Sequence, residues 1–300
     1  MTMKRVSIII VTYNSEDDIY DCVDSIIRCA DIPRSEIELV VVDNNSRAPE
    51  PMFQRLREQW GEDIVLIENT KNGGYGQGNN VGIRSCSAPL LLIMNPDVRL
   101  LTPFFHDALS AFGRDERLVM LGAKQMLSAD VASTNSFAPT YMMNGYFRSI
   151  LGAICTRLEW YVPSLMYFSG SCFYVRKSML EAVGLFDESV FMYGEEDDIR
   201  WRLQKRFGKR FVYNRRLKYV HLVSERKPDF EYEKKIADMT VFLHTKKGRS
   251  PQVTWRNLLR GTNVLIFRAR VWTLFGRQCD ERLAMLMQLR TYLKKKLSGK

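Results

Sequence analysis

The stretch "VSIIIVTYNSEDDIYDCVDSII", from Val6 to Ile27, decides the fold because its apolar pattern changes period halfway. Its first six residues are almost continuously β-branched, as expected of a strand that is covered on both faces. Ser15 followed by Asp18 predicts a capping box, and apolar residues then recur at helical spacing. A buried strand that leads directly into an amphipathic helix is the unit from which parallel α/β sheets are built.

The same alternation continues along the chain. "IELVVVD" (Ile37 to Asp43), "IVLIE" (Ile64 to Glu68) and "LLLIM" (Leu90 to Met94) predict three further buried strands. Helices are expected between them, near Met52 to Trp60 and around Asn79 to Ser87. Strands and helices joined by short links imply a doubly wound, mainly parallel sheet with flanking helices.

The second half is less regular. From about Thr134 to Tyr167 aromatic residues and methionines lie among turn residues, and beyond Ser250 one or two basic helices are predicted. Between these segments we expect a strand at Cys172–Val175, a helix at Lys177–Val183, a helix beginning near Glu196 and a strand at Phe211–Tyr213. We therefore predict one α/β domain at residues 1–245 and a basic amphipathic helical extension at residues 250–300.

Composition excludes several classes of protein. The 300 residues are 46% hydrophobic, enough for one large core. The polar residues that follow Val11 exclude a signal-peptide core, and no apolar run approaches the length of a membrane span. The six cysteines form no C-x-x-C pair, which excludes zinc-knuckle and redox motifs and predicts reduced core residues. We predict a cytoplasmic protein, peripheral at most on the inner face of the plasma membrane.

The charge of +10 is concentrated at the C-terminus. Residues 251–300 contain eleven Lys and Arg against Asp280 and Glu281, and apolar residues recur among the arginines near helical spacing. Such a helix can lie on anionic lipid. The alternative is that it packs onto the catalytic domain or onto a second copy in a homodimer. Nucleic acid is not expected as a partner, because no recognised binding module accompanies the charge.

Polar residues follow all four predicted N-terminal strands, at the edge where ligands collect in doubly wound sheets. They are Thr12, Tyr13 and Asn14, then Asp43, then Asn69, and last Asn95, Pro96 and Asp97. A carboxylate in the position of Asp43 can accept hydrogen bonds from a nucleotide, or it can close an Asx-turn or cap a helix. The glycine-rich Asn69–Ile83 allows close backbone approach but matches neither dinucleotide nor P-loop motifs.

Two acidic positions indicate catalysis. Asp97 supplies the kind of oxygen ligand that Mg²⁺ or Mn²⁺ takes when it also binds a diphosphate, and His221 could add a nitrogen ligand. Glu195 and Glu196 begin the acidic run "EEDD" at a predicted helix start. Closely spaced carboxylates raise one another's pKa, which suits a general base, although a capping role is the alternative.

The ordered set "SIIIVTYNS", "VVVDNNS", "NGGYGQGNNVGI", "LLIMNPDV", "GLFDESVFMYGEEDDIRWRL" and "YVHL" resembles the family 2 inverting glycosyltransferases of the GT-A fold, in their rhamnosyltransferase-like branch. The resemblance covers roughly the first three quarters of the chain. It implies a donor nucleotide site at Thr12, Tyr13, Asn14, Asp43, Asn72, Gly73 and Asn95, where Asn95 takes the first place of the family's Asp-x-Asp motif. It also implies a metal site at Asp97 and His221.

The resemblance further implies that Glu196, or else Glu195, is the base, and that Gly170, Ser171, Trp201 and Arg202 line the acceptor side. The expected reaction is inverting transfer from a dTDP- or UDP-sugar, with rhamnose as the branch's sugar, to a saccharide or lipid-linked hydroxyl in cell-surface polysaccharide or glycolipid synthesis. The alternative is a pseudoenzyme that binds a nucleotide-sugar without transfer, because Asn95 removes one charge from the metal site.

Overall fold

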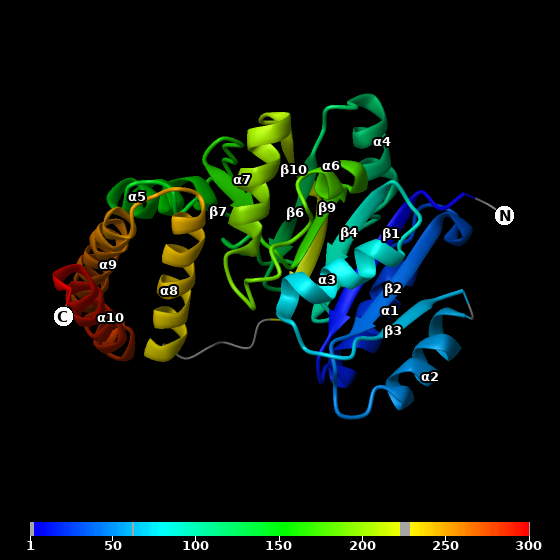
Figure 1. Ribbon diagram of the computed structural model, residues 1–300, viewed down its shortest axis with the longest axis horizontal. Helices are drawn as coiled ribbons and strands as arrows, with labels where there is room; N and C mark the ends of the chain where they lie inside the picture. The colour runs from blue at the N-terminus through cyan, green and yellow to red at the C-terminus, as the bar shows by residue number, and fades with distance from the viewer. Residues whose placement is uncertain (1–2, 62, 223–228, 300) are drawn as a thin grey trace. The chain divides into compact units, whose positions relative to one another are not determined.

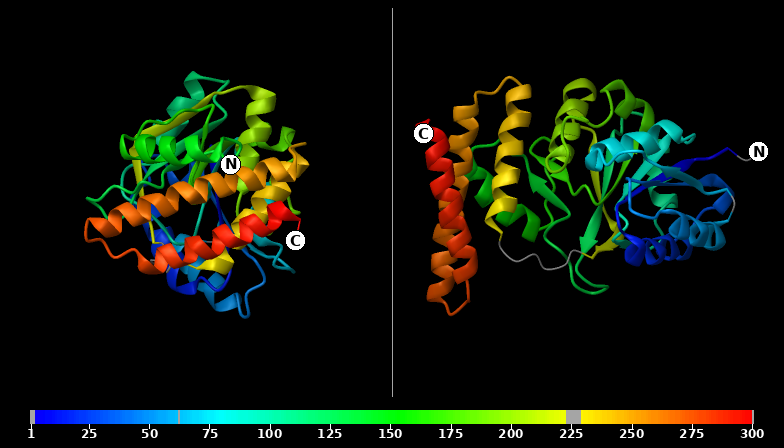
Figure 2. Two further views of the ribbon diagram at one scale, coloured as in Figure 1. Left: turned by 90° about the vertical axis from the view of Figure 1, so that its left-hand side faces the viewer. Right: turned by 60° about the horizontal axis from the view of Figure 1, so that its bottom comes forward.

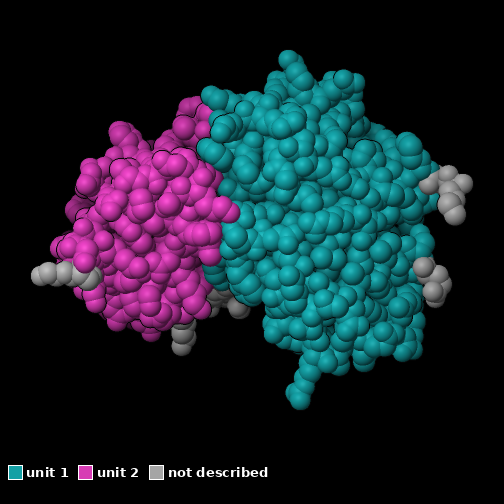
Figure 3. Space-filling view, in the orientation of Figure 1, with its two compact units in different colours: residues 1–137, 168–223 teal, residues 138–167, 224–300 magenta. Residues whose placement is uncertain are grey.

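The computed structural model describes the chain except for residues 1–2, 62, 223–228 and 300. It divides into two compact units, shown in different colours in Figure 3. The sheet unit comprises Met1–Phe137 and Phe168–Val223, and the helical unit comprises Ala138–Tyr167 and Ser224–Lys300. Each unit is therefore made of two separate segments of the chain.

An eight-stranded sheet forms the centre of the sheet unit (Figure 1). Its strands, in spatial order, are β3 (Val65–Glu68), β2 (Ile37–Asp43), β1 (Val6–Thr12), β4 (Leu90–Met94), β9 (Cys172–Arg176), β6 (Met120–Met126), β10 (Phe211–His221) and β5 (Val98–Leu100). β9 runs antiparallel to β4 and β6, and β5 runs antiparallel to β10, whereas the other neighbours are parallel. The predicted doubly wound, mainly parallel sheet is confirmed.

Helices cover both faces of this sheet, as the β-branched strands predicted. They are α1 (Glu16–Arg28), α2 (Glu50–Trp60), α3 (Gly74–Ser85), α4 (His106–Arg114), α6 (Lys177–Ala182) and α7 (Glu195–Phe207), with a 3₁₀ turn at Arg34–Glu36. In β1, Ile8 and Ile10 belong to the core that includes the apolar stripe of α1. Ile9 faces the other way, against Gly82 of α3. Alternate side chains of one strand thus enter two cores.

Helix α3 begins at Gly74, five residues before the predicted start, so that prediction was wrong. Its glycines let it lie directly on the sheet. A Cβ on Gly78 would lie 2.7 Å from Val11 Cγ1, and one on Gly82 would lie 2.7 Å from Ile9 Cγ2. The glycines therefore permit close helix–sheet packing, which a residue-by-residue propensity misses.

The capping box predicted at the start of α1 does not form. Ser15 is the N-cap residue, but its side chain makes no capping hydrogen bond. Its Oγ instead donates to the carbonyl of Tyr13 at 3.2 Å and accepts from the Tyr13 N–H at 3.3 Å. The hydroxyl thus stabilises the turn that leaves β1, while the acidic first turn of α1 complements the helix dipole.

Four helices make up most of the helical unit: α5 (Gly145–Arg157), α8 (Phe230–Lys246), α9 (Pro251–Leu274) and α10 (Asp280–Ser298). Figure 2 shows α9 beside both α5 and α10, and α9 contacts α8 as well. Trp255 of α9 packs with Val241 of α8 and Leu289 of α10. The strands β7 (Phe137–Pro139) and β8 (Met166–Phe168) pair where the chain enters and leaves α5.

This division differs from the predicted domains. The boundary at residues 245–250 falls between α8 and α9, whereas the structure places both helices in one compact unit together with α5. The sequence analysis treated residues 250–300 as an extension because it did not find α5 and α8 as their packing partners. Independent folding of residues 1–245 remains a prediction.

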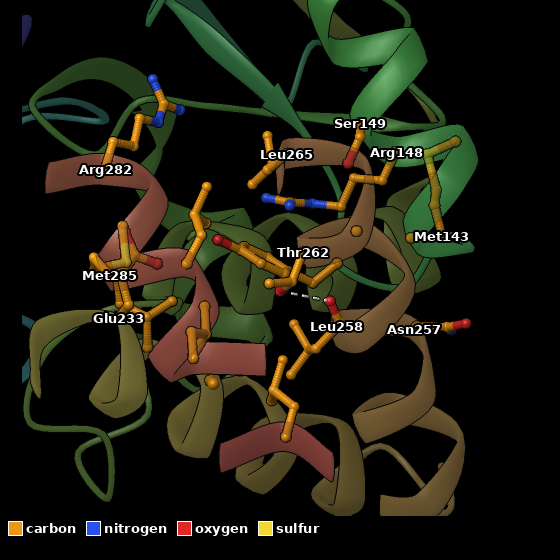
Figure 4. Close-up of a pocket in the computed structure, with 18 residues that line it drawn as sticks. Met143, Arg148, Ser149, Glu233, Asn257, Leu258, Thr262, Leu265, Arg282 and Met285 are labelled. Carbon is orange, nitrogen blue, oxygen red and sulfur yellow. Dashed lines mark hydrogen bonds between the residues drawn. The ribbon is translucent and has the colours of Figure 1, made fainter. Parts of the chain in front are cut away.

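A pocket of about 310 Å³ lies inside the helical unit, among α5, α8, α9 and α10 (Figure 4). Its walls are mainly apolar, and Arg148, Glu233 and Arg282 add charge. Burial raises the pKa of Glu233, and the two arginines oppose this. None of the residues that the sequence analysis assigned to the active site lines this pocket.

All six cysteines are buried free thiols, as predicted. Among the described residues, no helix combines the length and the apolar character needed to cross a membrane.

Candidate active site

The strand directions bring most of the predicted site residues to one edge of the sheet. β1, β2 and β4 are mutually parallel, so Thr12, Asp43 and Asn95 leave the sheet at the same edge. β9 runs in the opposite direction and begins there, directly after Ser171. β10 runs parallel to β6 and ends at this edge with His221.

Two contacts link the end of β4 to the start of the acidic helix α7. The Asn95 N–H donates to the carbonyl of Ser171 at 2.9 Å. Next to it, Gly170 leaves no room for a side chain, because an added Cβ would lie 2.1 Å from Glu196 Oε1. Gly170 and Ser171 therefore connect the turn that carries Asp97 to the start of α7, although these two segments are almost one hundred residues apart in the sequence.

Glu195 and Glu196 are the electrostatically unusual groups of this edge. Glu195 is 4% exposed, and its Oε1 is buried without a hydrogen-bond partner. Burial and the neighbouring carboxylate raise the pKa of Glu195 to about 8. Burial also raises the pKa of Glu196, against the backbone N–H groups of Gly170 and Gly194 that lower it. A carboxylate with a raised pKa is a better proton acceptor at neutral pH.

Within the part of the chain that the structure describes, the two aspartates of this acidic run form ion pairs with arginines, whereas the two glutamates do not. Asp197 lies 3.5 Å from Arg200, and Asp198 lies 2.7 Å from Arg202. In the described part of the chain, no basic side chain forms an ion pair with Glu195 or Glu196. The helix start thus has two carboxylates paired with arginines and two without a basic partner among the described residues.

The turn before α7 has an unusual backbone conformation. Tyr193 has a φ of 78° and Gly194 a φ of 97°, so two consecutive residues adopt left-handed conformations. A non-glycine residue in this region costs of order 1 kcal/mol and persists only where the surroundings impose it. The turn aims backbone N–H groups at both glutamate carboxylates, since Tyr193 donates toward Glu195 and Gly194 toward Glu196.

Tyr75 belongs to this site, although the sequence analysis did not select it. Its hydroxyl donates to the carbonyl of Gly170 at 2.6 Å. Burial raises its pKa, and the charges of Glu196 and Glu195 add to the effect, which places the phenol near both carboxylates. The position of Tyr75 in the glycine-rich segment could have marked it as a site residue, but only the tertiary structure shows that its side chain points toward Gly170.

Asp97 and His221, the residues predicted to bind a metal ion, lie next to each other. His221 Nε2 lies 3.2 Å from Asp97 Oδ2, and the side chains are 17% and 27% exposed. Asp97 Oδ1 is buried without a hydrogen-bond partner, as expected of an oxygen that awaits a ligand. Across the described residues there is no cluster of three or more ligating side chains. The pair fits a divalent cation that takes its other ligands from a diphosphate and water.

The predicted nucleotide residues lie close together, but Asp43 is already engaged. Its carboxylate is fully buried, accepts from Ser46 N–H at 2.7 Å and lies 3.3 Å from the hydroxyl of Thr12. The carboxylate thus holds the turn after β2 through the N–H three residues on, and a nucleotide contact by Asp43 remains a prediction. Tyr13 is 52% exposed and next to Asn14, which has a φ of 48°.

A network of side-chain amides supports the glycine-rich segment and was not predicted. Asn69 donates to Asn44 at 2.6 Å and to Gln77 at 2.7 Å, and Asn44 donates to Asn72 at 2.9 Å. The Asn72 oxygen also accepts from the Gly74 N–H. Asn72, which was predicted to lie beside the nucleotide-sugar, thus fixes the start of α3 at Gly74.

On the predicted acceptor side, Ser171 hydrogen-bonds Tyr219 at 3.0 Å and Ser169 at 2.9 Å. Arg202 is engaged inside the unit, because besides Asp198 it donates to the carbonyls of Val183 and Leu185. These bonds hold α7 to the turn at Val183–Leu185, which follows α6, so Arg202 has a structural role. Trp201 is partly buried, with Lys205 Nζ 5.2 Å from its ring centroid.

Comparison with known proteins identifies the family. The family model described as "Glycosyl transferase family 2" matches residues 7–184, which is more than half of the chain. The chain belongs to glycosyl transferase family 2. The match includes the strand exits at Thr12, Asp43 and Asn95–Asp97 and ends before α7.

Two curated relatives are similar over about 70% of this chain. The low-salt glycan biosynthesis hexosyltransferase Agl10 of Haloferax volcanii is 31% identical over 211 residues, which cover 68% of this chain and 62% of that protein. The O-antigen biosynthesis protein RfbC of Myxococcus xanthus is 25% identical over 228 residues, which cover 72% of this chain and 17% of that protein. The chain therefore matches less than two thirds of the length of either relative.

Solved structures confirm the predicted GT-A type of fold. The mannosyltransferase PcManGT from Pyrobaculum calidifontis, in complex with GDP-Man and Mn²⁺, gives a TM-score of 0.64 at 18% identity and covers 100% of this chain and 89% of its own. Residues 1–349 of S. aureus TarS in complex with UDP give 0.57 at 16% identity, with 99% and 92% coverage. At these identities the likeness concerns the fold alone.

Proposed function

We propose that this family 2 protein is an inverting glycosyltransferase, which moves a sugar from a nucleotide-diphosphate donor to an acceptor hydroxyl in glycan synthesis. One observation carries the proposal: two adjacent glutamates with raised pKa values lack a basic partner among the described residues, and one of them, Glu196, contacts Gly170 next to the Asn95–Asp97 turn. A base and a diphosphate-binding turn at one sheet edge are what a direct displacement needs.

Glu196 is the proposed base. It is partly exposed, whereas Glu195 is 4% exposed and cannot meet an acceptor without movement. Its carboxylate would take the proton of the acceptor hydroxyl as that oxygen attacks the anomeric carbon, and the configuration would invert. The buried Glu195, whose pKa of about 8 keeps it mostly protonated at neutral pH, would leave the proton transfer to Glu196. Tyr75 would hold Gly170, and so the wall behind Glu196, in place.

Asp97 and His221 would hold a Mg²⁺ or Mn²⁺ ion, and the fit rests on the free Asp97 oxygen and the adjacent imidazole. When bound, such an ion neutralises negative charge on a departing diphosphate. Thr12, Tyr13, Asn14, Asp43, Asn72, Gly73 and Asn95 are proposed to contact the donor, and Gly170, Ser171 and Trp201 to contact the acceptor. Arg202 is proposed to support the acceptor side from behind.

The names of the relatives and of similar structures support a hexose-type sugar as the proposed donor. One is named a hexosyltransferase of glycan biosynthesis, and similar folds were solved with GDP-Man and Mn²⁺ or with UDP. We propose a dTDP- or UDP-linked hexose or deoxyhexose, rhamnose included, and a saccharide or lipid-linked acceptor. Membrane contact through residues 251–300 is proposed too, since exposed Phe267, Leu274 and Phe275 lie among arginines of α9.

The test is a panel of nucleotide-sugars scored for thermal stabilisation with and without Mn²⁺, followed by transfer assays on the donor that binds. Glu196→Gln should keep donor binding and lose transfer by at least a factor of about 100. Full transfer by this variant would exclude Glu196 as the base. Donor binding with no transfer or donor hydrolysis by the unmodified chain would instead favour the non-catalytic binding protein.

A further inference from the structure

One side of helix α5 is exposed and apolar. Tyr146, Phe147, Ile150 and Ile154 are between 45% and 68% exposed, and Leu158 follows at 60%. The last four lie three to four residues apart and therefore share one side of the helix. The opposite side is occupied, because Gly145, Arg148 and Ser149 line the pocket of the helical unit (Figure 4). The exposed stripe is thus not needed for the core of this unit.

Helix α9 extends this surface. Val253, Phe267 and Leu274 are 38%, 67% and 85% exposed and, with Arg260, recur every seven residues along one side of the helix. The two helices touch closely, since a Cβ on Gly145 would lie 1.9 Å from the carbonyl oxygen of Asn257. The Arg260 guanidinium lies 5.8 Å from the ring centroid of Tyr146, so the two apolar stripes are neighbours.

Charge on these helices has a single sign. Neither α5 nor α9 contains an aspartate or glutamate, whereas together they contain Arg148, Arg157, Arg256, Arg260, Arg268 and Arg270. Tryptophans flank the apolar residues: Trp160 is 63% exposed after α5, and Trp272 lies between Arg268 and Arg277 at 5.1 and 5.3 Å. Apolar side chains with arginines and tryptophans at the border are typical of helices that lie in a membrane interface.

We propose that this α5–α9 face is the surface with which the protein binds an anionic lipid bilayer, with the α5 stripe inserted among the lipids and the α9 arginines contacting head groups. The proposal rests on the membrane contact proposed above. It adds that residues 146–158, outside the basic C-terminal segment, supply the apolar part of the contact.

Charge decides against a second copy of the chain as the occupant. A two-fold dimer through this face would bring the same patch onto itself, so arginines would face arginines without acidic partners on either helix. An anionic bilayer instead neutralises each of them. A contiguous apolar surface of this kind is also rare on proteins that stay free in solution.

The experiment measures partitioning of the full chain onto vesicles of phosphatidylglycerol and phosphatidylcholine by co-sedimentation. The double variant Ile150→Glu/Ile154→Glu should bind at least about tenfold more weakly. Arg256→Glu/Arg270→Glu should weaken binding to anionic vesicles and leave the low binding to pure phosphatidylcholine unchanged. The control Leu127→Glu/Val212→Glu, which adds the same charge at exposed apolar positions of the sheet unit, should bind normally.

The two proposals fail differently. Normal binding by the α5 variant with loss in the α9 variant would overturn the inference and leave the C-terminal contact standing. Normal vesicle binding by both variants would overturn this inference and the proposed C-terminal membrane contact. If the unmodified protein is a dimer and the α5 variant is a monomer, the face binds a second copy of the chain instead. A further readout is the quenching of tryptophan fluorescence by brominated lipids, which Trp160→Phe should reduce. Unchanged quenching in that variant would place α5 outside the bilayer.

Discussion

Replacing Glu195 by glutamine tests whether the fold holds this carboxyl group protonated. Burial and the neighbouring Glu196 raise the pKa of Glu195 from the ordinary 4.5 to about 8. Between these pH values the folded chain keeps a proton that the unfolded chain has lost. The free energy of unfolding should therefore fall as the pH rises from about 4.5 to 8, and this loss should be complete above pH 8.

The structure sets the size of this effect. The two pKa values differ by about 3.5, which at about 1.36 kcal/mol per pH unit corresponds to roughly 5 kcal/mol for the coupled pair. A glutamine has nearly the shape of a protonated glutamate and does not titrate. Glu195→Gln should match the unmodified protein near pH 4.5 and exceed its stability by an amount approaching this value at pH 8.5.

The assay is urea unfolding of both proteins at pH 5, 6, 7 and 8.5. Glu188→Gln is the control, because hydrogen bonds from Asn80 and Arg84 lower the pKa of Glu188. Its stabilising contribution is present at neutral pH and is lost as the pH falls, which is the opposite sign. Parallel stability profiles for Glu195→Gln and the unmodified chain, or a less stable variant at pH 8.5, would refute the reasoning.

Three further substitutions test the site and its support. Asp97→Asn should abolish the extra thermal stabilisation that Mn²⁺ gives to a bound nucleoside diphosphate, and an unchanged shift would remove Asp97 from the metal site. Gly170→Ala should lower transfer at least tenfold while donor binding persists, because the new Cβ would lie 2.1 Å from Glu196 Oε1. Gly78→Ala should cost about 1–3 kcal/mol in urea unfolding by crowding Val11. Gly113→Ala has open space around it and should be neutral or stabilising by up to about 1 kcal/mol, so equal effects at the two glycines would contradict the packing argument.

The order of strands and helices was predictable because it follows from local periodicity. The residues that follow the four predicted strands could be placed at one edge of the sheet, because parallel strands all end at the same edge. The antiparallel β9 was not predictable, because nothing in "CFYVR" encodes the direction in which it enters the sheet. Its reversed direction is nevertheless what brings Ser171 to Asn95.

Side-chain partners were the least predictable part of the site. The residue types suggest that Asp97 and His221 share a metal ion, but their 3.2 Å distance depends on where β10 ends. The amide of Gln77 and the phenol of Tyr75 point where α3 directs them. That helix begins in glycines, which local propensity assigns to a loop.

The split composition of the helical unit has a consequence for synthesis of the chain. Helix α5 is complete at Arg157, but the helices that cover its inner side end only at Ser298. At ordinary translation rates the interval is on the order of ten seconds. Until α8 and α9 emerge, the exposed apolar stripe of α5 has no partner helix from its own unit, so a ribosome-associated chaperone or a nearby bilayer would reach it first.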